Sequence, residues 1–341
     1  MHMTDALLST TVGISMSVVS LAAIGYSIKK IKEDDLCEKK IPIMGVMGAF
    51  VFASQMINFS IPGTGSSGHI GGGILLAATL GGFPALLAIS AVLIIQCLFF
   101  ADGGLLALGC NIFNIGIIPC LIVYPLLFKP LIKNCMTMKR ITLASIIAVV
   151  IGLQFGAFSV VLETHVSNIN QIPFSTFLIL MQPIHLAIGI IEGIITASIL
   201  CFVHKLRPEI MESTFNRTII ENSVPMRSVL ITLVSITLVI GGALSLFASS
   251  NPDGLEWSIG KIIGDIELKP KSSLSKNAEA IKGFTVFMPD YGFKDDDENI
   301  AGTSTAGIVG GTLTFILAGV SALGITLIKK KKKRNEAIRC K

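Results

Sequence analysis

Two histidines stand where they could bind a transition metal together with the start of the chain. His2 directly follows Met1, and His69 ends the glycine- and serine-rich stretch "GTGSSGH". The Met1 amine, the backbone amide nitrogen of His2 and the His2 imidazole can close fused chelate rings around one ion. Among common divalent ions, Cu(II) and Ni(II) best displace the amide proton, and they favour square-planar nitrogen sets. The imidazole of His69 could complete such a set, since histidine is the commonest protein metal ligand.

The composition indicates that a lipid bilayer surrounds most of the chain. Of its 341 residues, 52% are hydrophobic and only 14% are charged, and the mean hydropathy is +0.75. A soluble domain carries about 25% charged residues. So few charges cannot cover a water-facing surface of this size, and apolar runs of about 18 or more residues predict transmembrane helices.

Nine apolar runs predict an all-α polytopic membrane protein with about nine transmembrane helices. The runs lie near residues 8–28, 41–59, 69–82, 84–100, 107–128, 141–162, 175–203, 228–249 and 306–328. The third and fourth runs could form one broken helix or two short ones. The breaker "GGFP" between them favours two helices.

The basic residues predict which side of the membrane each loop occupies. The stretches "KKIKEDDLCEKK", "KPLIKNCMTMKR", "HKLRPEIMESTFNR" and "KKKKKR" follow spans one, five, seven and nine. Nine alternating spans place all four on one side, which the positive-inside rule makes cytoplasmic. The N-terminus, His2 and His69 are then expected at the outer face, and the C-terminus in the cytoplasm.

An outward N-terminus also argues against a cleaved signal peptide. Such a peptide carries a basic region before its apolar core. Here Lys29 and Lys30 follow the first apolar run instead of preceding it. We therefore expect Met1 to remain as the mature terminus, with its amine available to an ion.

The chain divides into two modules. Residues 1–212 hold seven spans with short loops, residues 213–227 form a polar cytoplasmic linker, and residues 228–341 hold the last two spans. Between these two spans lies a polar outer segment, residues 250–305, which predicts a small extracytoplasmic domain. Its acidic run "DDDE" could be a second metal site, although oxygen ligands suit magnesium, calcium or manganese better than nickel or cobalt.

Several further polar residues lie near the outer face or inside a predicted span. His185 and Glu192 in "PIHLAIGIIEG" are seven residues apart and share one helical face. Ionisable groups inside a span are usually paired or functional, so these two could form a structural pair or lie on the path of an ion. Asp102 could cap a helix, while Asn111 and Asn114 could orient metal ligands through hydrogen bonds.

No motif indicates that this chain hydrolyses ATP. The phosphate-binding signature GxxxxGK[ST] is absent, as are GxSxG and HExxH. Two alternatives to metal capture remain open. One is an intramembrane hydrolase that uses His185 and Glu192, and the other is a membrane receptor or assembly protein whose outer segment binds a partner.

Three stretches resemble the CbiM/NikM family, the metal-binding membrane components of energy-coupling-factor cobalt and nickel importers. They are "MHMTDALLSTTVG", "GTGSSGHIGGGILLA" and "FFADGGLLALGCNIFNIGIIPC", and the resemblance covers about residues 1–205. The second module, with "NPDGLEWS" and "FMPDYGF", resembles the CbiN/NikN-like PDGLE domain. The metal site of the family matches Met1, His2 and His69.

The resemblance implies a non-catalytic subunit in the plasma membrane of a prokaryote that captures Co(II) or Ni(II). It implies no prosthetic group and no nucleic-acid partner. A transmembrane coupling (T) protein and cytoplasmic ABC-type ATPases would be separate chains. The small residues Ser20, Ala23 and Ser27 on the first span would let a partner helix approach closely, or would serve internal packing. The stretch "NPDGLEWS" is expected to pack over the outer mouth of the first module and to help load or open it.

Overall fold

Helices occur at all nine apolar segments in the computed structural model. It describes residues 1–33, 41–133, 135–170, 172–216, 226–264, 268, 272–293 and 301–339, and the acidic run at 295–298 lies outside them. Within these ranges, seven helices are long and apolar enough to cross a membrane. The chain is therefore a multi-pass membrane protein. A total of nine crossings, and the orientation of the N-terminus, remain predictions.

The first module contains all the elements up to the polar linker. In chain order they are η1 (Asp5–Leu7), α1 (Thr10–Glu33), α2 (Ile41–Gln55), β1 (Phe59–Ile61), β2 (Ser66–Gly68), α3 (Gly73–Leu80), α4 (Gly82–Phe99), α5 (Leu108–Asn111), η3 (Ile112–Phe128), α6 (Lys129–Ile132), α7 (Met138–Ser167), α8 (Phe174–Leu206) and α9 (Pro208–Asn216). The strands β1 and β2 form an antiparallel hairpin. The second module adds α10 (Met226–Gly242), η4 (Leu244–Phe247), α11 (Gly254–Ile263), α12 (Ser273–Thr285), η5 (Pro289–Tyr291) and α13 (Ala301–Arg339).

The structure confirms two helices at the "GGFP" stretch. Helix α3 ends at Leu80, and Gly81 adopts a φ of 94° and a ψ of 155° before α4 begins. Such a positive φ favours glycine, because other residues are strained there. Pro84 lies in the first turn of α4, where a missing N–H costs no intrahelical hydrogen bond. With eight residues, α3 is about 12 Å long, well short of the roughly 30 Å hydrocarbon core.

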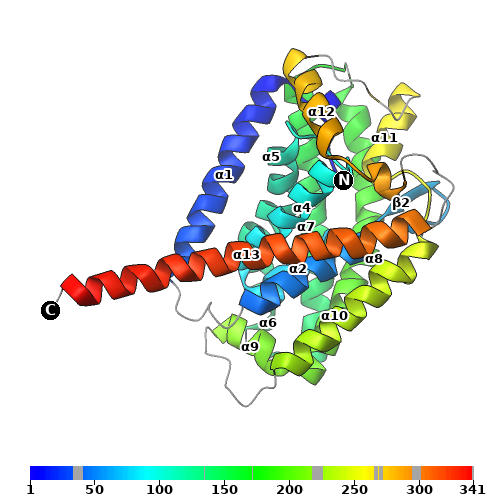
Figure 1. The fold of residues 1–341 in the computed structure, drawn as a ribbon. Coiled ribbons are helices and arrows are strands. Elements are labelled where there is room, and N and C mark those ends of the chain that lie inside the picture. Colours follow the sequence, from blue (N-terminus) through cyan, green and yellow to red (C-terminus); the bar gives the residue numbers. More distant parts are fainter. Residues whose placement is uncertain are drawn as a thin grey trace.

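The helices of the first module pack tightly around a long apolar core. Helices α7 and α8 lie against each other along their lengths, and η3 packs on α7 and α4. A methyl group on Gly193 would lie 2.9 Å from the Cα of Ile146, so small residues allow α7 and α8 this close approach. Helix α13 crosses α2 and α10, and its C-terminal end projects beyond the bundle (Figure 1).

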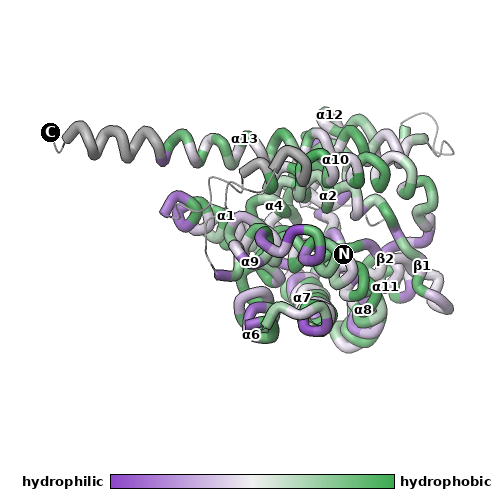
Figure 2. Tube along the Cα trace, turned by 90° about the horizontal axis from the view of Figure 1, so that it is seen from below, coloured by the Kyte–Doolittle hydropathy of each residue, from purple (hydrophilic) through white to green (hydrophobic). Residues whose placement is uncertain are grey.

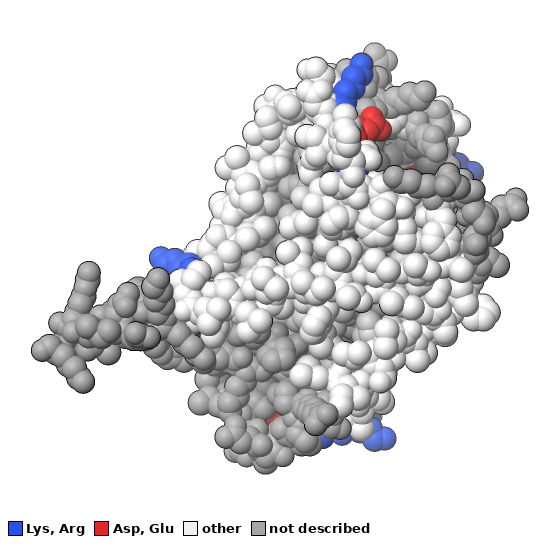
Figure 3. Space-filling model, in the orientation of Figure 1, with Lys and Arg blue, Asp and Glu red and all other residues white. Residues whose placement is uncertain are grey.

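The outer surface of the bundle matches a lipid environment. Large apolar side chains face outward on several helices, such as Leu21 on α1 (66% exposed) and Ile179 on α8 (69% exposed). Hydrophobic residues make up most of the length of the long helices that the structure describes (Figure 2). A broad surface without described acidic or basic side chains separates the charged residues at the two ends (Figure 3). Apolar surface of this extent requires lipid or a protein partner to cover it.

The chain start and the outer segment of the second module share one end of the molecule. The N-terminus, α11 and α12 lie at the upper end in Figure 1, whereas α6 and α9 lie at the lower end. The predicted topology places these ends on the outer and cytoplasmic sides. This arrangement puts α11 and α12 at the same end of the molecule as the chain start (Figure 1).

Candidate metal site

The first residues of the chain are buried inside the upper end of the bundle. Met1 and His2 are only 8% and 7% exposed, and Met3 is fully buried. The backbone N–H of Met3 donates to Oδ1 of Asn111 at 2.8 Å, and Nδ2 of Asn111 donates to the carbonyl of Met3 at 3.1 Å. Chain ends usually fray unless such bonds hold them. Asn111 therefore positions the terminus, while its role in orienting metal ligands remains a prediction.

Asp5 anchors the same segment two residues further on. Its Oδ1 accepts a hydrogen bond from the backbone N–H of Ala107 at 2.9 Å. The carbonyl of Met3 accepts from the N–H of Gly104 at 2.9 Å. A methyl group on Gly104 would overlap Asp5, so the 102–107 loop can enclose the terminus only with glycine at this position. Sequence reasoning missed this role of Asp5.

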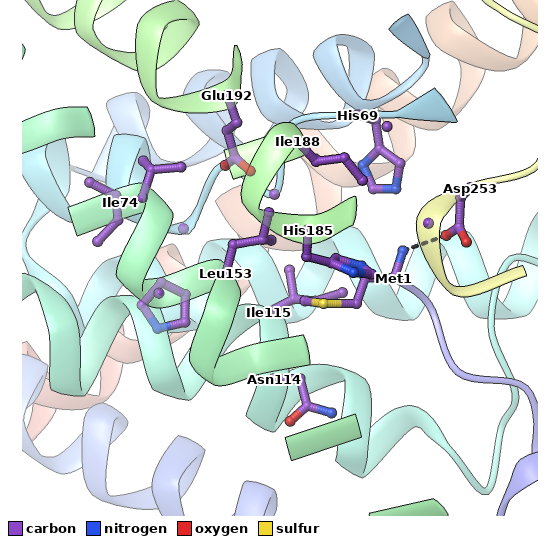
Figure 4. A pocket seen from close by; sticks show the side chains of 17 residues that line it. Met1, His69, Ile74, Asn114, Ile115, Leu153, His185, Ile188, Glu192 and Asp253 are labelled. Atoms are coloured by element: carbon purple, nitrogen blue, oxygen red, sulfur yellow. Dashed lines mark hydrogen bonds and ion pairs between the residues drawn. The ribbon is translucent and has the colours of Figure 1, made fainter. Parts of the chain in front are cut away.

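The structure brings His2 and His69 together. Their rings stack with centroids 5.2 Å apart and planes inclined by 8°. His69 reaches this position because it follows β2 and precedes the glycine turn into α3. The amine of Met1 lies close by, and Met1 and His69 line one cavity (Figure 4). The three predicted ligand residues therefore meet at one place, while binding of an ion by them remains a prediction.

Nε2 of His69 can bind a metal ion or accept a hydrogen bond. Its Nδ1 lies 3.0 Å from the carbonyl of Ile70 and must donate, because a carbonyl only accepts. The lone pair is then on Nε2. Burial, with help from the charges of the terminal amine and His2, lowers the pKa of His69 to about 4. The ring is therefore neutral at pH 7.

Asp102 contacts His2 directly. Its Oδ1 lies 3.1 Å from Nδ1 of His2, and its other oxygen accepts from the hydroxyl of Tyr291 in η5. Burial alone would raise the pKa of Asp102, but the charge of His2 and the hydrogen bonds from His2 and Tyr291 outweigh it. The pKa lies below its usual range, so the carboxyl is ionised. Nε2 of His2 has no partner among the described residues.

The amine of Met1 pairs with a carboxylate from the second module. It contacts Oδ2 of Asp253, the residue that caps the N-terminus of α11 (Figure 4). Oδ1 of Asp253 accepts from the N–H groups of Leu255 at 2.8 Å and Glu256 at 2.9 Å. Burial raises the pKa of Asp253, but the charge of the Met1 ammonium and the hydrogen bonds to the carboxylate lower the pKa by a larger amount. The carboxyl is therefore ionised. Asp253 was not among the predicted site residues.

The second module contacts both loops that carry the site. Nε1 of Trp257 donates to the carbonyl of Thr64 at 2.9 Å, and the N–H of Ser67 donates to the carbonyl of Pro252 at 2.8 Å. These bonds join α11 to the β1–β2 hairpin ahead of His69. On the other side, Nζ of Lys282 donates to the carbonyl of Gly103 at 2.7 Å. The outer segment thus packs over the site, as expected for "NPDGLEWS".

A cavity of about 40 Å³ extends inward from the Met1 amine. This is enough room for a water molecule or an ion. Its polar lining residues are Met1, His69, Asn114, His185, Glu192 and Asp253 (Figure 4). Oε1 of Glu192 accepts from the N–H of Gly72 at 3.1 Å, which fixes the turn after His69. Nδ2 of Asn114 donates to Glu163 at 2.8 Å.

The site lacks a conventional side-chain cluster. In the part of the chain that the structure describes, no three His, Cys, Asp or Glu side chains are close enough to hold a metal ion. The predicted ligand set does not require such a cluster, because two of its nitrogens belong to the main chain of Met1 and His2.

The three small residues on α1 differ in their surroundings. Ser20 is buried, and its hydroxyl donates to the carbonyl of Gly109 at 2.6 Å. Ser27 is also buried, and Ala23 is half-buried. The Ser20 position therefore joins α1 to α5 inside this chain. Docking of a partner helix at these positions remains a prediction.

The comparisons with known proteins agree on metal transport. A family model for the cobalt uptake substrate-specific transmembrane region (CbiM) matches residues 2–210, and one for the PDGLE domain matches residues 227–327. A relative from Archaeoglobus fulgidus, provisionally named fused nickel transport protein NikMN, is 29% identical over 93% of this chain and 96% of its own length.

Two further matches cover the first module. A Methanocaldococcus jannaschii protein, provisionally named cobalt transport protein CbiM, is 31% identical over 57% of this chain and 83% of its own length. The crystal structure of a truncated transition metal transporter matches with a TM-score of 0.53 and 26% identity, over 60% of this chain and 99% of that one. This chain therefore belongs to the CbiM family of cobalt and nickel transport proteins and carries a PDGLE domain fused behind the CbiM region.

Proposed function

We propose that this chain is the substrate-capture subunit of an ATP-driven energy-coupling-factor importer for Co(II) or Ni(II). The ion binds at the outer face through the Met1 amine, the backbone amide nitrogen and imidazole of His2, and the imidazole of His69. The observation that carries the proposal is the meeting of the buried chain start with two stacked imidazoles. The family's link to cobalt and nickel supports the choice of ion.

The chemistry of the chelate assigns a role to each nitrogen. Within His2, only Nδ1 is close enough to its own backbone amide nitrogen to close a second chelate ring, which would share that amide nitrogen with the ring closed by the amine. When an ion enters, the Met1 ammonium, the His2 amide and Nδ1 of His2 must each release a proton to water, and Nδ1 leaves Asp102 while the amine leaves Asp253. Both carboxylates then stand beside a positively charged centre and stabilise it by Coulomb attraction. His69 supplies Nε2, because its Nδ1 stays bound to Ile70.

Energy for transport has to come from other chains in this proposal. The sequence lacks a phosphate-binding loop, so a transmembrane coupling protein and cytoplasmic ATPases supply ATP hydrolysis. The chain lies in the plasma membrane of a prokaryote. The outer segment gates the site, because Asp253, Trp257 and Lys282 contact the terminus and both loops around it.

The two alternatives fit less well. A hydrolase built on His185 and Glu192 needs a nucleophile or a metal beside them, and the described lining of their cavity contains no serine, threonine or cysteine. Glu192 is also occupied in capping the turn at Gly72. A receptor would present the outer segment to a partner, but its Asp253 and Trp257 face the first module instead.

Metal binding by histidine variants tests the proposal. His2→Ala and His69→Ala, made in the full chain with a free N-terminus, should each lower Ni(II) and Co(II) affinity at least about 100-fold, beyond the usual effect of a supporting residue. The matched control is His165→Ala, because His165 is exposed and packs against Phe174, with ring centroids 5.1 Å apart. Wild-type affinity in both test variants, measured by isothermal titration calorimetry, would reject the site.

A further inference from the structure

Helix α12 of the outer segment is tied at both ends to helices that can cross the membrane. The hydroxyl of Thr10, the first residue of α1, donates at 3.4 Å to that of Ser272, which caps the start of α12. Just beyond the other end, the N–H of Phe287 donates at 3.2 Å to the carbonyl of Phe99, the last residue of α4. Both α1 and α4 are long and apolar enough to span a bilayer. Helix α12 therefore lies along the boundary at which these two helices leave the membrane.

One face of α12 is apolar and exposed. Phe284 is 92% exposed and Ile281 is 54% exposed, and Leu274 is exposed as well. Leu274 and Ile281 are seven residues apart, and Phe284 follows three residues later, so the three side chains share one side of the helix. Phe287 adds a further exposed ring just after the helix ends. Apolar surface of this kind requires lipid or a protein to cover it.

The remaining side chains of α12 form two other faces. Ser275 and Ala278 are buried, and they attach the helix to the rest of the chain. Lys276 and Glu279 are exposed. At 3.6 residues per turn, these two charged side chains lie roughly opposite the apolar face. A helix with one face toward protein, one apolar and one charged fits the corner at which protein, lipid and water meet.

The apolar face of α12 continues the lipid-facing surface of the bundle. In both Figure 1 and Figure 2, α12 lies at the edge of the molecule on the side of α13. Helix α13 exposes large apolar side chains such as Ile308 and Ile316. The ring of Phe287 packs against Phe99 and Phe100 at the end of α4, with centroids 5.7 and 5.6 Å away. The bilayer that covers the bundle can therefore reach α12 without a gap.

We propose that α12 lies in the membrane–water boundary, in the leaflet on the side of the chain start. The predicted topology makes this the outer leaflet. Leu274, Ile281 and Phe284 insert among the lipid chains, while Lys276 and Glu279 face water. Amphipathic helices bind a bilayer surface in this way, through the apolar area that they bury. The inference concerns the outer segment alone, and it holds whether or not the chain binds Co(II) or Ni(II).

A bilayer contact at α12 would also hold the outer segment against the first module. Nζ of Lys282, in the last turn of α12, donates to the carbonyl of Ala101 at 3.2 Å and to that of Gly103 at 2.7 Å. Movement of α12 away from the membrane would break these bonds. Lipid therefore stabilises the position of the outer segment over the 101–103 loop.

Photo-cross-linking in a bilayer tests which molecule covers the apolar face. The full chain with Phe284→p-benzoylphenylalanine is placed in phosphatidylcholine/phosphatidylglycerol vesicles and irradiated. The matched control carries the same residue at Glu279 on the charged face, and a third variant carries it at Leu21, which faces lipid on α1. Mass spectrometry should find at least about 5-fold more lipid adduct at position 284 than at position 279. Equal yields at these two positions, lipid adducts at position 21 alone, or cross-links from position 284 to a second copy of the chain would overturn the proposal.

Hydrogen exchange measures how firmly the bilayer holds the helix. Ile281→Ser combined with Phe284→Ser removes apolar side chains that are mostly exposed within the chain, so packing inside the protein changes little. In phospholipid nanodiscs, the amides of α12 should then exchange at least about 10-fold faster, because two large apolar side chains no longer enter the lipid. Lys276→Ser on the charged face is the matched control and should leave the rates unchanged. Unchanged rates in the double variant would overturn the proposal.

Discussion

Single side chains hold the chain start where an ion could bind it. The amide of Asn111 pairs with both the N–H and the carbonyl of Met3, as a neighbouring strand would. Asp102 and Asp253 hold the imidazole of His2 and the amine of Met1. These contacts replace the freedom of a chain terminus with a defined position, which lowers the entropy lost when a metal binds.

We expect Asn111→Ala to weaken metal binding, although Asn111 is not itself a proposed ligand. The change leaves the buried N–H and carbonyl of Met3 without their side-chain partner, which costs about 1–3 kcal/mol. Affinity for Ni(II) should fall about 10- to 100-fold, as for other groups that orient ligands. Asn111→Asp keeps the acceptor for the N–H of Met3 and should lose less Ni(II) affinity than Asn111→Ala. Equal affinities for the alanine variant and the wild type, measured by calorimetry, would show that Asn111 does not position the site.

Glu192 provides a second test at this scale. Glu192→Gln keeps an oxygen that can accept from the N–H of Gly72, whereas Glu192→Ala leaves that buried N–H unpaired. Metal affinity should stay within about 3-fold of the wild type in the glutamine variant and fall about 10-fold in the alanine variant. The same loss in both variants would indicate that the negative charge of Glu192, and not its hydrogen bond, matters.

The sequence predicted the meeting of Met1, His2 and His69, but among the groups that hold them it nominated only Asn111 and Asp102 and missed Asp5 and Asp253. Met1 and His2 were recognisable because an amine, an amide and an imidazole at a chain start form a chelate by covalent geometry alone, and His69 because its imidazole could complete the nitrogen set. Asp253 is 252 residues away from Met1 along the chain. Its motif, Asp-Gly-Leu-Glu, is a capping box and predicts a helix start. That the capping carboxylate also faces the amine depends on how the two modules dock.

Hydropathy predicts where the helices lie, and glycine and proline explain where a helix is short or interrupted. Each predicted apolar run contains a helix, yet α2 and α3 are shorter than a membrane span. The break at Gly81 was predicted from "GGFP". The short length of α3 was not, because glycine-rich stretches before it carry no periodic signal that marks where a helix begins. That region instead forms the β1–β2 hairpin and the turn that carries His69.

The positive φ of Gly81 allows a test of the break between α3 and α4. Gly81→Ala puts a side chain at a φ of 94° and should lower the unfolding free energy by more than about 1 kcal/mol. Gly25→Ala is the matched control, since nothing lies within 4 Å of a methyl group at Gly25 inside α1. Its effect should be neutral or slightly stabilising, because alanine favours helix. Thermal unfolding in detergent compares the two, and equal midpoints would contradict the strained break.

At the scale of the whole molecule, the second module covers the site of the first. Helix α11 contacts the hairpin ahead of His69, and α12 and η5 contact the 101–103 loop. The composition of the outer segment indicated a domain outside the membrane. Packing of "NPDGLEWS" over the site was expected from the sequence, but the individual contacts could not be predicted, since they join residues far apart in the chain and several use backbone carbonyls that carry no sequence signal.

Removing residues 250–305, which cover the site, should change the rate of ion exchange more than the affinity for the ion. Replacing residues 250–305 by a short Gly/Ser linker opens the site to water, so the bound ion should exchange faster in stopped-flow experiments. Uptake by the full transporter should slow, because the gate is missing. Equilibrium affinity for Ni(II) should stay within about 10-fold of the wild type, since Met1, His2 and His69 remain. Loss of binding together with uptake would instead make the outer segment a ligand donor.

The free amine of Met1 is the feature on which the whole account depends. One residue added before Met1 moves the amine along the chain and turns Met1 into an ordinary peptide unit, so the fused chelate cannot form. The control carries the same extra residue after Lys341, and mass spectrometry verifies both termini. We predict that the N-terminal extension abolishes high-affinity Ni(II) and Co(II) binding while the control binds as the wild type does. Wild-type affinity in the extended protein would contradict the amino-terminal site.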